Sequence, residues 1–113
     1  MVGKGQAKKL AMWKLELCDG ATLVEVEMRR ASALDLLQFG FDAHETLGAP
    51  VEWIKKVYER FMFMTRGWKE DGEERPLAEL SGRLEESLEL TMQFVNCGLE
   101  RLEELRKKTE ENP

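Results

Sequence analysis

Residue types that can carry covalent or acid–base chemistry are sparse in this sequence, and their spacing forms no catalytic set. There is one histidine, His44, and there are two cysteines, Cys18 and Cys97, none with a second candidate group close by in the chain. The sequence contains no phosphate-binding loop, nucleophile elbow or zinc-protease motif. Catalysis needs a nucleophile or base together with an orienting group, so we expect no catalytic residues and a protein that is not an enzyme.

The residues also give little indication of a metal site or a cofactor site. The cysteines form no Cys-x-x-Cys pair, and acidic pairs such as Glu103-Glu104 fall on helix faces that should be solvated. Two isolated cysteines in so short a chain are typical of reduced thiols in a cytosolic protein. We therefore expect no metal site, no cofactor and a cytoplasmic location, which is the host cytoplasm if the protein is viral.

Length and composition restrict the class of protein further. The 113 residues suit one domain with a modest core, and at 42% hydrophobic they are too apolar for a disordered chain. No apolar run approaches the ~20 residues of a membrane span, so we expect no membrane interaction. Residues 1–68 carry 10 basic and 9 acidic side chains, whereas residues 69–113 carry 7 and 13. This acidic last third would repel a phosphate backbone, so we expect no nucleic-acid partner.

A β-hairpin is predicted over residues 10–28, where apolar and polar residues alternate on both sides of Asp19-Gly20. Asp-Gly between such runs indicates a two-residue type I′ turn. The resulting cross-strand pairs are Cys18 with Ala21, Leu15 with Val24, Trp13 with Val26, and Lys14 with Glu25. One face then collects the apolar side chains Trp13, Leu15, Leu17, Val24 and Val26. Two strands alone are marginal in water, so helices must cover this face.

Two shorter helices should follow the hairpin. The first is predicted at about 33–39, because Ser32 and Asp35 have capping-box spacing and Gly40 offers a stop. Its apolar side would hold Leu34, Leu37 and Phe41. The second is predicted at about 50–66, with Pro50 at its first position. Its core stripe is Val51, Ile54, Val57, Tyr58, Phe61 and Met62. We interpret the charged segment after it, residues 67–76, as a linker.

A long helix is predicted at 77–105. Its leucine, methionine and valine positions run from Leu77 to Leu105 in eight steps of three or four, a mean spacing of 3.5 residues that is typical of coiled coils. The predicted oligomer seam comprises Leu84, Leu88, Val95, Leu99 and Leu102. Glycine disfavours a helix interior, so Asn96–Gly98 is a candidate break in this helix. The chain is thus predicted to have a mobile basic arm (1–9), one α+β domain (10–105) and a frayed tail (106–113). In that domain the hairpin packs on three or so helices.

Methionine and aromatic side chains are abundant for so small a domain and suggest a partner surface. Phe61-Met62-Phe63-Met64 cannot all point inward from one helix, and such side chains are common at adaptable interfaces. The predicted partner-binding residues are Trp53, Phe63, Met64, Trp68, Met92 and Phe94. We expect Phe63 and Met64 in particular to be exposed.

The stretch Leu15–Phe41 resembles the first part of some phage tail assembly chaperones. In those proteins a strand pair around a glycine turn leads to an arginine-rich step and a short leucine-rich helix closed by glycine. The corresponding segments here are Asp19-Gly20, Arg29-Arg30, Ala33 to Phe39 and Gly40. The resemblance implies a small cytosolic protein, not retained in the virion, that coats apolar segments of a tape-measure protein during tail assembly.

The sequence therefore predicts a non-enzymatic protein-binding module, with a phage-type tail assembly chaperone as the leading hypothesis. Its partner would be another protein that offers an apolar or amphipathic helix. Two alternatives remain open. One is a self-associating regulatory or structural protein that forms a homo-oligomer, and the other is a small phage-encoded inhibitor of a host protein.

Overall fold

The computed structural model describes residues 12–111, and the side chains of residues 12–108, as a four-stranded sheet combined with helices. The elements are β1 (Met12–Asp19), β2 (Thr22–Arg29), α2 (Ala33–Glu45), α3 (Pro50–Met64), β3 (Thr65–Glu70), β4 (Glu73–Arg75), the short 3-10 helix η1 (Leu77–Glu79), α4 (Leu80–Glu85) and α5 (Leu88–Glu111). The sheet is antiparallel in the order β1-β2-β3-β4. The predicted α+β class is confirmed, whereas the predicted arm at 1–9 lies outside the described residues.

The β1–β2 hairpin turns one residue later than predicted. It closes on Gly20-Ala21, so Asp19 pairs with Thr22, and only Gly20 of the two turn residues has a positive φ, at 63°. Positive φ at the first turn position alone is the pattern of a type II′ turn. Each β1 residue therefore pairs two positions further along β2: Leu15 with Val26, Trp13 with Met28 and Lys14 with Glu27. Because the shift is two residues, the apolar side chains keep the predicted face.

A second hairpin was missed in the segment interpreted as a linker. β3 pairs with β2 and then turns back into β4 through Asp71-Gly72, where φ is 48° and 83°. Positive φ at both positions is the type I′ geometry that had been expected at Asp19-Gly20. The carboxylate of Asp71 also accepts a hydrogen bond from Leu23 N–H at 2.9 Å, which fixes this turn against β2.

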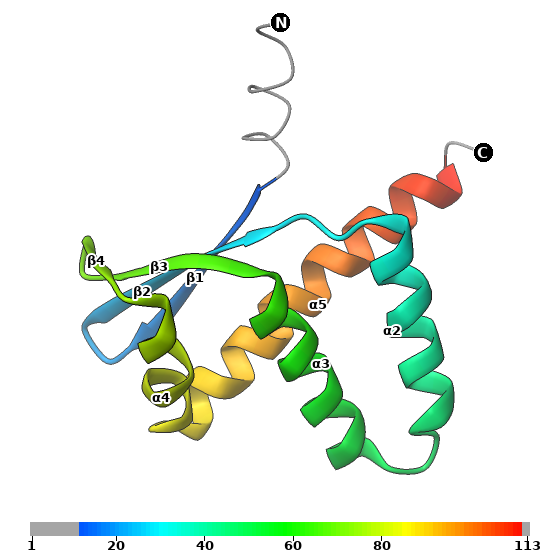
Figure 1. Cartoon of the computed structure of the whole chain (residues 1–113), viewed down its shortest axis with the longest axis horizontal. Helices are drawn as coiled ribbons and strands as arrows, with labels where there is room; N and C mark the ends of the chain where they lie inside the picture. Colours follow the sequence, from blue (N-terminus) through cyan, green and yellow to red (C-terminus); the bar gives the residue numbers. More distant parts are fainter. Residues whose placement is uncertain (1–11, 112–113) are drawn as a thin grey trace, which may run out of the picture.

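The core lies between one face of the sheet and the helices α3, α4 and α5. Leu15 and Leu17 of β1 and Val24, Val26 and Met28 of β2 are buried on this face. In Figure 1, α5 passes behind α3, while α2 and α3 stand to one side of the sheet as an antiparallel pair. The predicted covering of the hairpin's apolar face by helices is confirmed.

Side chains of α5 also occupy the outer edge of β1. Cys18 N–H donates to Gln93 Oε1 at 2.9 Å, and Gln93 Nε2 donates to the Cys18 carbonyl at 2.8 Å. Arg101 donates in turn to the Lys14 carbonyl at 3.1 Å. These side chains satisfy backbone groups that would otherwise be open to pairing with another strand.

The predicted long helix is divided, but at a different place from Asn96–Gly98. α4 ends at Glu85, and Ser87 starts α5 as an N-cap whose hydroxyl accepts a hydrogen bond from Leu90 N–H at 3.2 Å. α5 then continues to Glu111, so the predicted frayed tail is helical up to that residue.

The predicted oligomer seam packs largely within the chain itself. Leu84, Val95 and Leu102 are buried in the core and Leu99 is half-buried against it, so the seam does not form an exposed stripe for a coiled coil with a second copy. Leu88 lies outside the seam and is 81% exposed, because it is the first residue of α5 and follows directly on the break. The 3.5-residue spacing therefore predicted correctly that most of these side chains are buried. It did not predict that they pack on helices and strands of the same chain.

The two earlier helices also differ from their predicted bounds. α2 is capped by Ser32 and Asp35 as expected, but it passes through Gly40 and continues to Glu45. α3 begins at Pro50 as expected and ends at Met64, because β3 starts directly at Thr65. The Thr65 hydroxyl closes the helix end by donating to the Phe61 carbonyl at 2.8 Å.

Helices α3 and α5 approach closely at Gly98 of α5, which faces the ring of Phe61 on α3. A Cβ at position 98 would lie 2.4 Å from that ring. We predict that Gly98→Ala lowers the free energy of unfolding by about 1–3 kcal/mol, since overpacking outweighs the better helix propensity of alanine. Gly82→Ala is the matched control, because no atom lies within 4 Å of its Cβ position. Urea titration should show no loss of unfolding free energy for the control. Equal stability of the two variants would contradict the close contact between Gly98 and Phe61.

Candidate binding groove

An apolar groove lies between α2 and α5, with α3 at its floor. Its apolar lining residues are Leu36, Phe39 and Ala43 of α2, Trp53 of α3, and Leu99 and Leu102 of α5. The groove encloses about 680 Å³. A second apolar hollow adjoins it at Ala43 and Trp53 and is completed by the turn between α2 and α3. We call the two together the α2/α5 groove.

α2 is fixed at its N-terminal end by Asp35, which acts both as a cap and as an ion-pair partner. Its carboxylate accepts a hydrogen bond from Ser32 N–H at 2.7 Å, while Asp35 N–H donates to the Ser32 hydroxyl at 3.2 Å. Arg29 at the end of β2 donates to the same carboxylate. This hydrogen bond lowers the pKa of Asp35 and ties the start of α2 to the sheet.

A buried carboxylate holds the other half of α2 against α3. Asp42 is 1% exposed and accepts hydrogen bonds from Arg60 Nε of α3 at 2.9 Å and from Gln38 Nε2 at 3.1 Å. The hydrogen bond from Arg60 is the main reason why the pKa of Asp42 lies below its ordinary value. Asp42 therefore keeps its charge in the folded protein and positions the α2 wall of the groove.

Aromatic rings connect the groove to the core. Phe39 of α2 packs on Phe61 of α3 with ring centroids 5.2 Å apart, and Phe61 meets Phe94 of α5 edge-on at 6.2 Å. These contacts run continuously from one wall of the groove to the other, so the two walls are held at a set spacing.

The rim of the groove is mainly acidic. Glu100, Glu103 and Arg106 of α5 line it together with Asn96. Arg106 donates to Glu103 at 3.0 Å, whereas none of the described cations lies within ion-pair distance of Glu100. The rim therefore offers an uncompensated carboxylate beside an apolar floor.

The structure separates the six predicted partner-binding residues. Trp53 lines the groove, Phe63 is exposed on α3 with the Arg29 guanidinium 6.0 Å from its ring centroid, and Met92 is half-buried. Met64, Trp68 and Phe94 are buried within the chain, so the expectation that they form a surface was wrong. Met64 lies at the end of α3, where the chain bends into β3 and brings its side chain against the core.

Sequence reasoning missed the α2 wall of the groove. Leu36, Gly40 and Ala43 line it, but Gly40 had been interpreted as the end of the helix. The available signal was that apolar residues surround most of this segment, including Leu36, Leu37, Phe39 and Phe41. Such a helix must meet other groups on more than one side.

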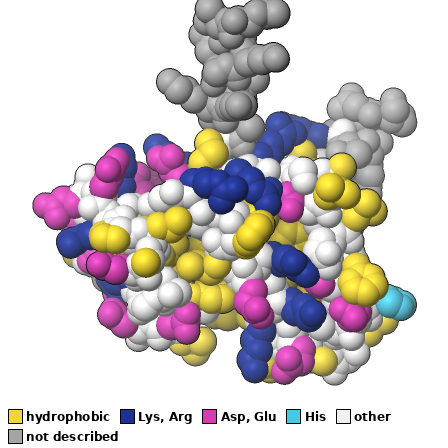
Figure 2. Space-filling view, in the orientation of Figure 1, with side chains coloured by type: hydrophobic (Ala, Val, Ile, Leu, Met, Phe, Trp, Pro, Cys, Tyr) yellow, Lys and Arg dark blue, Asp and Glu magenta, His cyan; other side chains and the backbone are white. Residues whose placement is uncertain are grey.

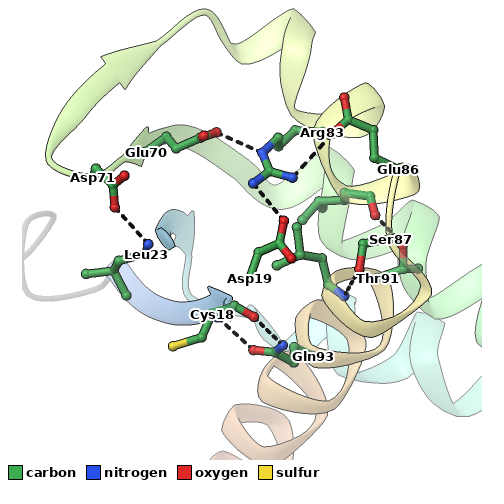
Figure 3. A network of polar contacts seen from close by, with 12 residues as sticks. Cys18, Asp19, Leu23, Glu70, Asp71, Arg83, Glu86, Ser87, Thr91 and Gln93 are labelled. Atoms are coloured by element: carbon green, nitrogen blue, oxygen red, sulfur yellow. Dashed lines mark hydrogen bonds and ion pairs between the residues drawn. The ribbon is translucent and has the colours of Figure 1, made fainter. Parts of the chain in front are cut away.

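A polar network at the far end of the sheet has a structural role. The Arg83 guanidinium of α4 donates to Glu70 at 2.8 Å, Asp19 at 3.0 Å and Glu86 at 3.3 Å (Figure 3). Asp19 and Glu70 each precede a hairpin turn, so one side chain ties both turns to α4. The hydrogen bonds to Glu70 and Asp19 raise the pKa of Arg83, which stays charged.

The described residues offer few other side chains that could bind a metal or react. Their His, Cys, Asp and Glu side chains form no group of three or more that could hold a metal ion. His44 is exposed on α2, Cys18 is exposed on β1 and Cys97 is half-buried on α5. No helix in this part of the chain is long and apolar enough to cross a membrane.

Comparisons with known proteins identify no relative of this chain. No protein-family model matches the chain, and searches of curated proteins and of solved structures likewise found no match.

The anchor at Asp42 should make the position of α2 sensitive to pH. A carboxylate whose pKa is lowered on folding stabilises the fold above its unfolded pKa of about 3.9, and this contribution is lost as the pH falls through the lower, folded pKa. We predict that Asp42→Asn costs about 1–3 kcal/mol at pH 7. The difference from wild type should shrink below pH 4 in denaturant titrations. Glu52→Gln, an exposed control whose contact with Lys55 is 3.8 Å, should have little effect at any pH.

The adjacent residues Phe63 and Met64 should respond oppositely to the same change. Phe63 is 76% exposed and Met64 is 1% exposed. Phe63→Ser should therefore shift the free energy of unfolding by about 0.5–1 kcal/mol at most, and Met64→Ser should lower it by about 2–5 kcal/mol. Thermal and chemical unfolding measure both. Similar losses for the two variants would show that the end of α3 is misplaced.

Proposed function

We propose that this chain is a protein-binding module that holds an amphipathic helix of another protein in the α2/α5 groove. The observation that carries the proposal is an apolar trough between two helices, with an acidic rim and a tryptophan in its floor. Helix-in-groove recognition uses this arrangement, in which the apolar face of the ligand helix enters the trough and its polar face stays in water.

The dimensions of the groove favour a helix over a small molecule. One wall is α2, whose 13 residues at 1.5 Å each extend for about 20 Å. The trough continues past Ala43 and Trp53 into the hollow beside Leu47 and Pro50. An elongated apolar surface of this kind suits three or four turns of a helix, whereas a small ligand is usually enclosed on most sides.

Gly40 supports close approach of a ligand backbone. It lies in the middle of α2, where glycine costs about 1 kcal/mol relative to alanine. Nothing lies within 4 Å of its Cβ position, so packing within the chain does not require glycine there. Gly40 lines the groove, and its missing side chain leaves room for another helix to cross α2 at this point.

The charge on the rim selects the kind of helix. Glu100 has no cation within ion-pair distance among the described residues, and the last third of the chain is acidic as a whole. A partner helix with Lys or Arg beside its apolar face would meet complementary charge, and one flanked by Asp or Glu would be repelled.

A holding function of this type is what a phage tail assembly chaperone performs for its tape-measure protein, and we propose that role as the leading biological assignment. The support is the resemblance of Leu15–Phe41 together with a groove able to cover apolar helical segments. Co-expression with fragments of a tape-measure protein tests it. The chaperone should keep the fragments in solution as a complex, and fragments that precipitate equally with or without it would count against the role.

The binding mode itself can be tested with designed peptides. A basic-flanked amphipathic 18-residue peptide should bind at least about tenfold more tightly than its acidic-flanked counterpart, a difference of about 1.4 kcal/mol. A scrambled peptide of equal composition should not bind. Intrinsic fluorescence gives the readout, since Trp53 lines the groove. Equal affinity for all three peptides would refute recognition of a helix.

Two substitutions locate the peptide. Ala43→Arg adds a long side chain to an exposed position inside the groove and should weaken binding at least about tenfold. Ala78→Arg, exposed on η1, is the control and should bind normally.

Gly40→Ala should stabilise the fold by up to about 1 kcal/mol yet weaken binding, while Gly82→Ala should stabilise the fold without affecting binding of the peptide. Unchanged binding by both groove variants would place the ligand elsewhere.

A further inference from the structure

The outer side of α2 carries an apolar stripe that does not belong to the groove. Leu34, Leu37 and Phe41 are 76%, 70% and 56% exposed, and none of them lines the groove. In Figure 2, hydrophobic side chains reach the surface along the edge of the molecule where Figure 1 places α2. Three large neighbouring apolar side chains on a helix in water mark a contact surface.

Nothing in the fold requires apolar groups at these positions. α2 is held by Asp35, Phe39 and Asp42, which face the rest of the chain. Charged or polar residues at the stripe would serve the monomer better, because they would avoid aggregation. The stripe is therefore explained by contact with another molecule.

We infer that a second copy of this chain covers the stripe, with the two α2 helices packed antiparallel about a twofold axis. The stripe together with His44 has the spacing three, four, three, which is the same in both directions along the helix. An antiparallel copy therefore places Leu37 beside Phe41 of the second copy, and the twofold axis repeats that contact. The same register sets Leu34 beside His44 of the second copy.

The charges at the two ends of α2 favour the antiparallel orientation. Arg30 precedes the helix, is exposed, and has no ion pair with any described residue. Glu45 ends the helix, is half-exposed, and has a single long contact of 3.7 Å with Lys56. Antiparallel packing brings Arg30 of each copy to the end that carries Glu45 of the other, whereas parallel packing would bring the two Arg30 side chains together. Opposed helix dipoles favour the same orientation.

The dimer leaves the α2/α5 groove accessible, since the stripe and the groove occupy different sides of α2. One dimer would therefore present two grooves. A contact made by one helix from each copy is small, so we expect a weak dimer whose population depends on concentration. This inference does not depend on the proposed function, because it concerns the free protein.

Sedimentation equilibrium of the full chain tests the inference directly. Wild type should show a monomer–dimer equilibrium, and Leu37→Asp should shift it to monomer without loss of thermal stability, because the position is exposed. Phe63→Asp, an equally exposed apolar site on α3 outside the stripe, should dimerise like wild type. A wild-type protein that stays monomeric at the highest attainable concentration, or a Leu37→Asp variant that still dimerises, overturns the proposal.

A charge exchange tests the orientation. Arg30→Glu alone should weaken the dimer at least about tenfold, because each copy then opposes Glu45 of the other with like charge. Combining Arg30→Glu with Glu45→Arg should restore the dimer. Failure of the double variant to recover, with its fold intact by circular dichroism, would refute the antiparallel arrangement.

Discussion

The ring of Phe61 is the contact on which the helical part of the molecule depends. It lies on the bare backbone of α5 at Gly98, packs against Phe39 of α2 and meets Phe94 edge-on. One side chain therefore sets the distances among three helices. Through these contacts Phe61 links α3 to both helices that form the walls of the α2/α5 groove.

α2 illustrates how one helix can serve three purposes. Its polar groups Asp35 and Asp42 form hydrogen-bonded ion pairs with Arg29 and Arg60, so they anchor the helix to β2 and α3. Its apolar residues divide into a core contact at Phe39, a groove wall and an outer stripe. A helix with so little polar surface would be expected to lie deep in a protein. Here it lies at the edge of the molecule, and both of its free sides are the contact surfaces that we propose.

The sheet is protected from pairing with other chains, and this affects which mode of recognition is available. Gln93 and Arg101 occupy backbone groups on the outer edge of β1, and β4 at the other edge is short and charged. Strand addition is therefore disfavoured at both edges. Arg83 reinforces the arrangement by joining both hairpin turns to α4. Both contact surfaces that we propose accordingly lie on helices and not on a strand edge.

Local sequence by itself determined which side chains share a face and where several elements begin. Alternation in β1 and β2 gave the buried face, the Ser32–Asp35 pair gave the start of α2, and Pro50 gave the start of α3. The spacing from Leu80 to Leu102 indicated burial, though Leu88 is an exception. These features depend on backbone periodicity and on hydrogen bonds between residues close in the chain, so they can be derived without knowledge of the rest of the fold.

Tertiary structure decided which faces have neighbours and which of two possible turns forms. Asp19-Gly20 and Gly20-Ala21 are both acceptable turns, and the register was settled by packing of the whole sheet. The charged segment Thr65–Arg75 became strands because β2 offered a free edge. α2 continued through Gly40 because Phe39 and Asp42 are held on either side of it. Leu34, Leu37 and Phe41 form the stripe that periodicity predicts, but periodicity cannot tell whether another element lies opposite, and here the described chain leaves them exposed.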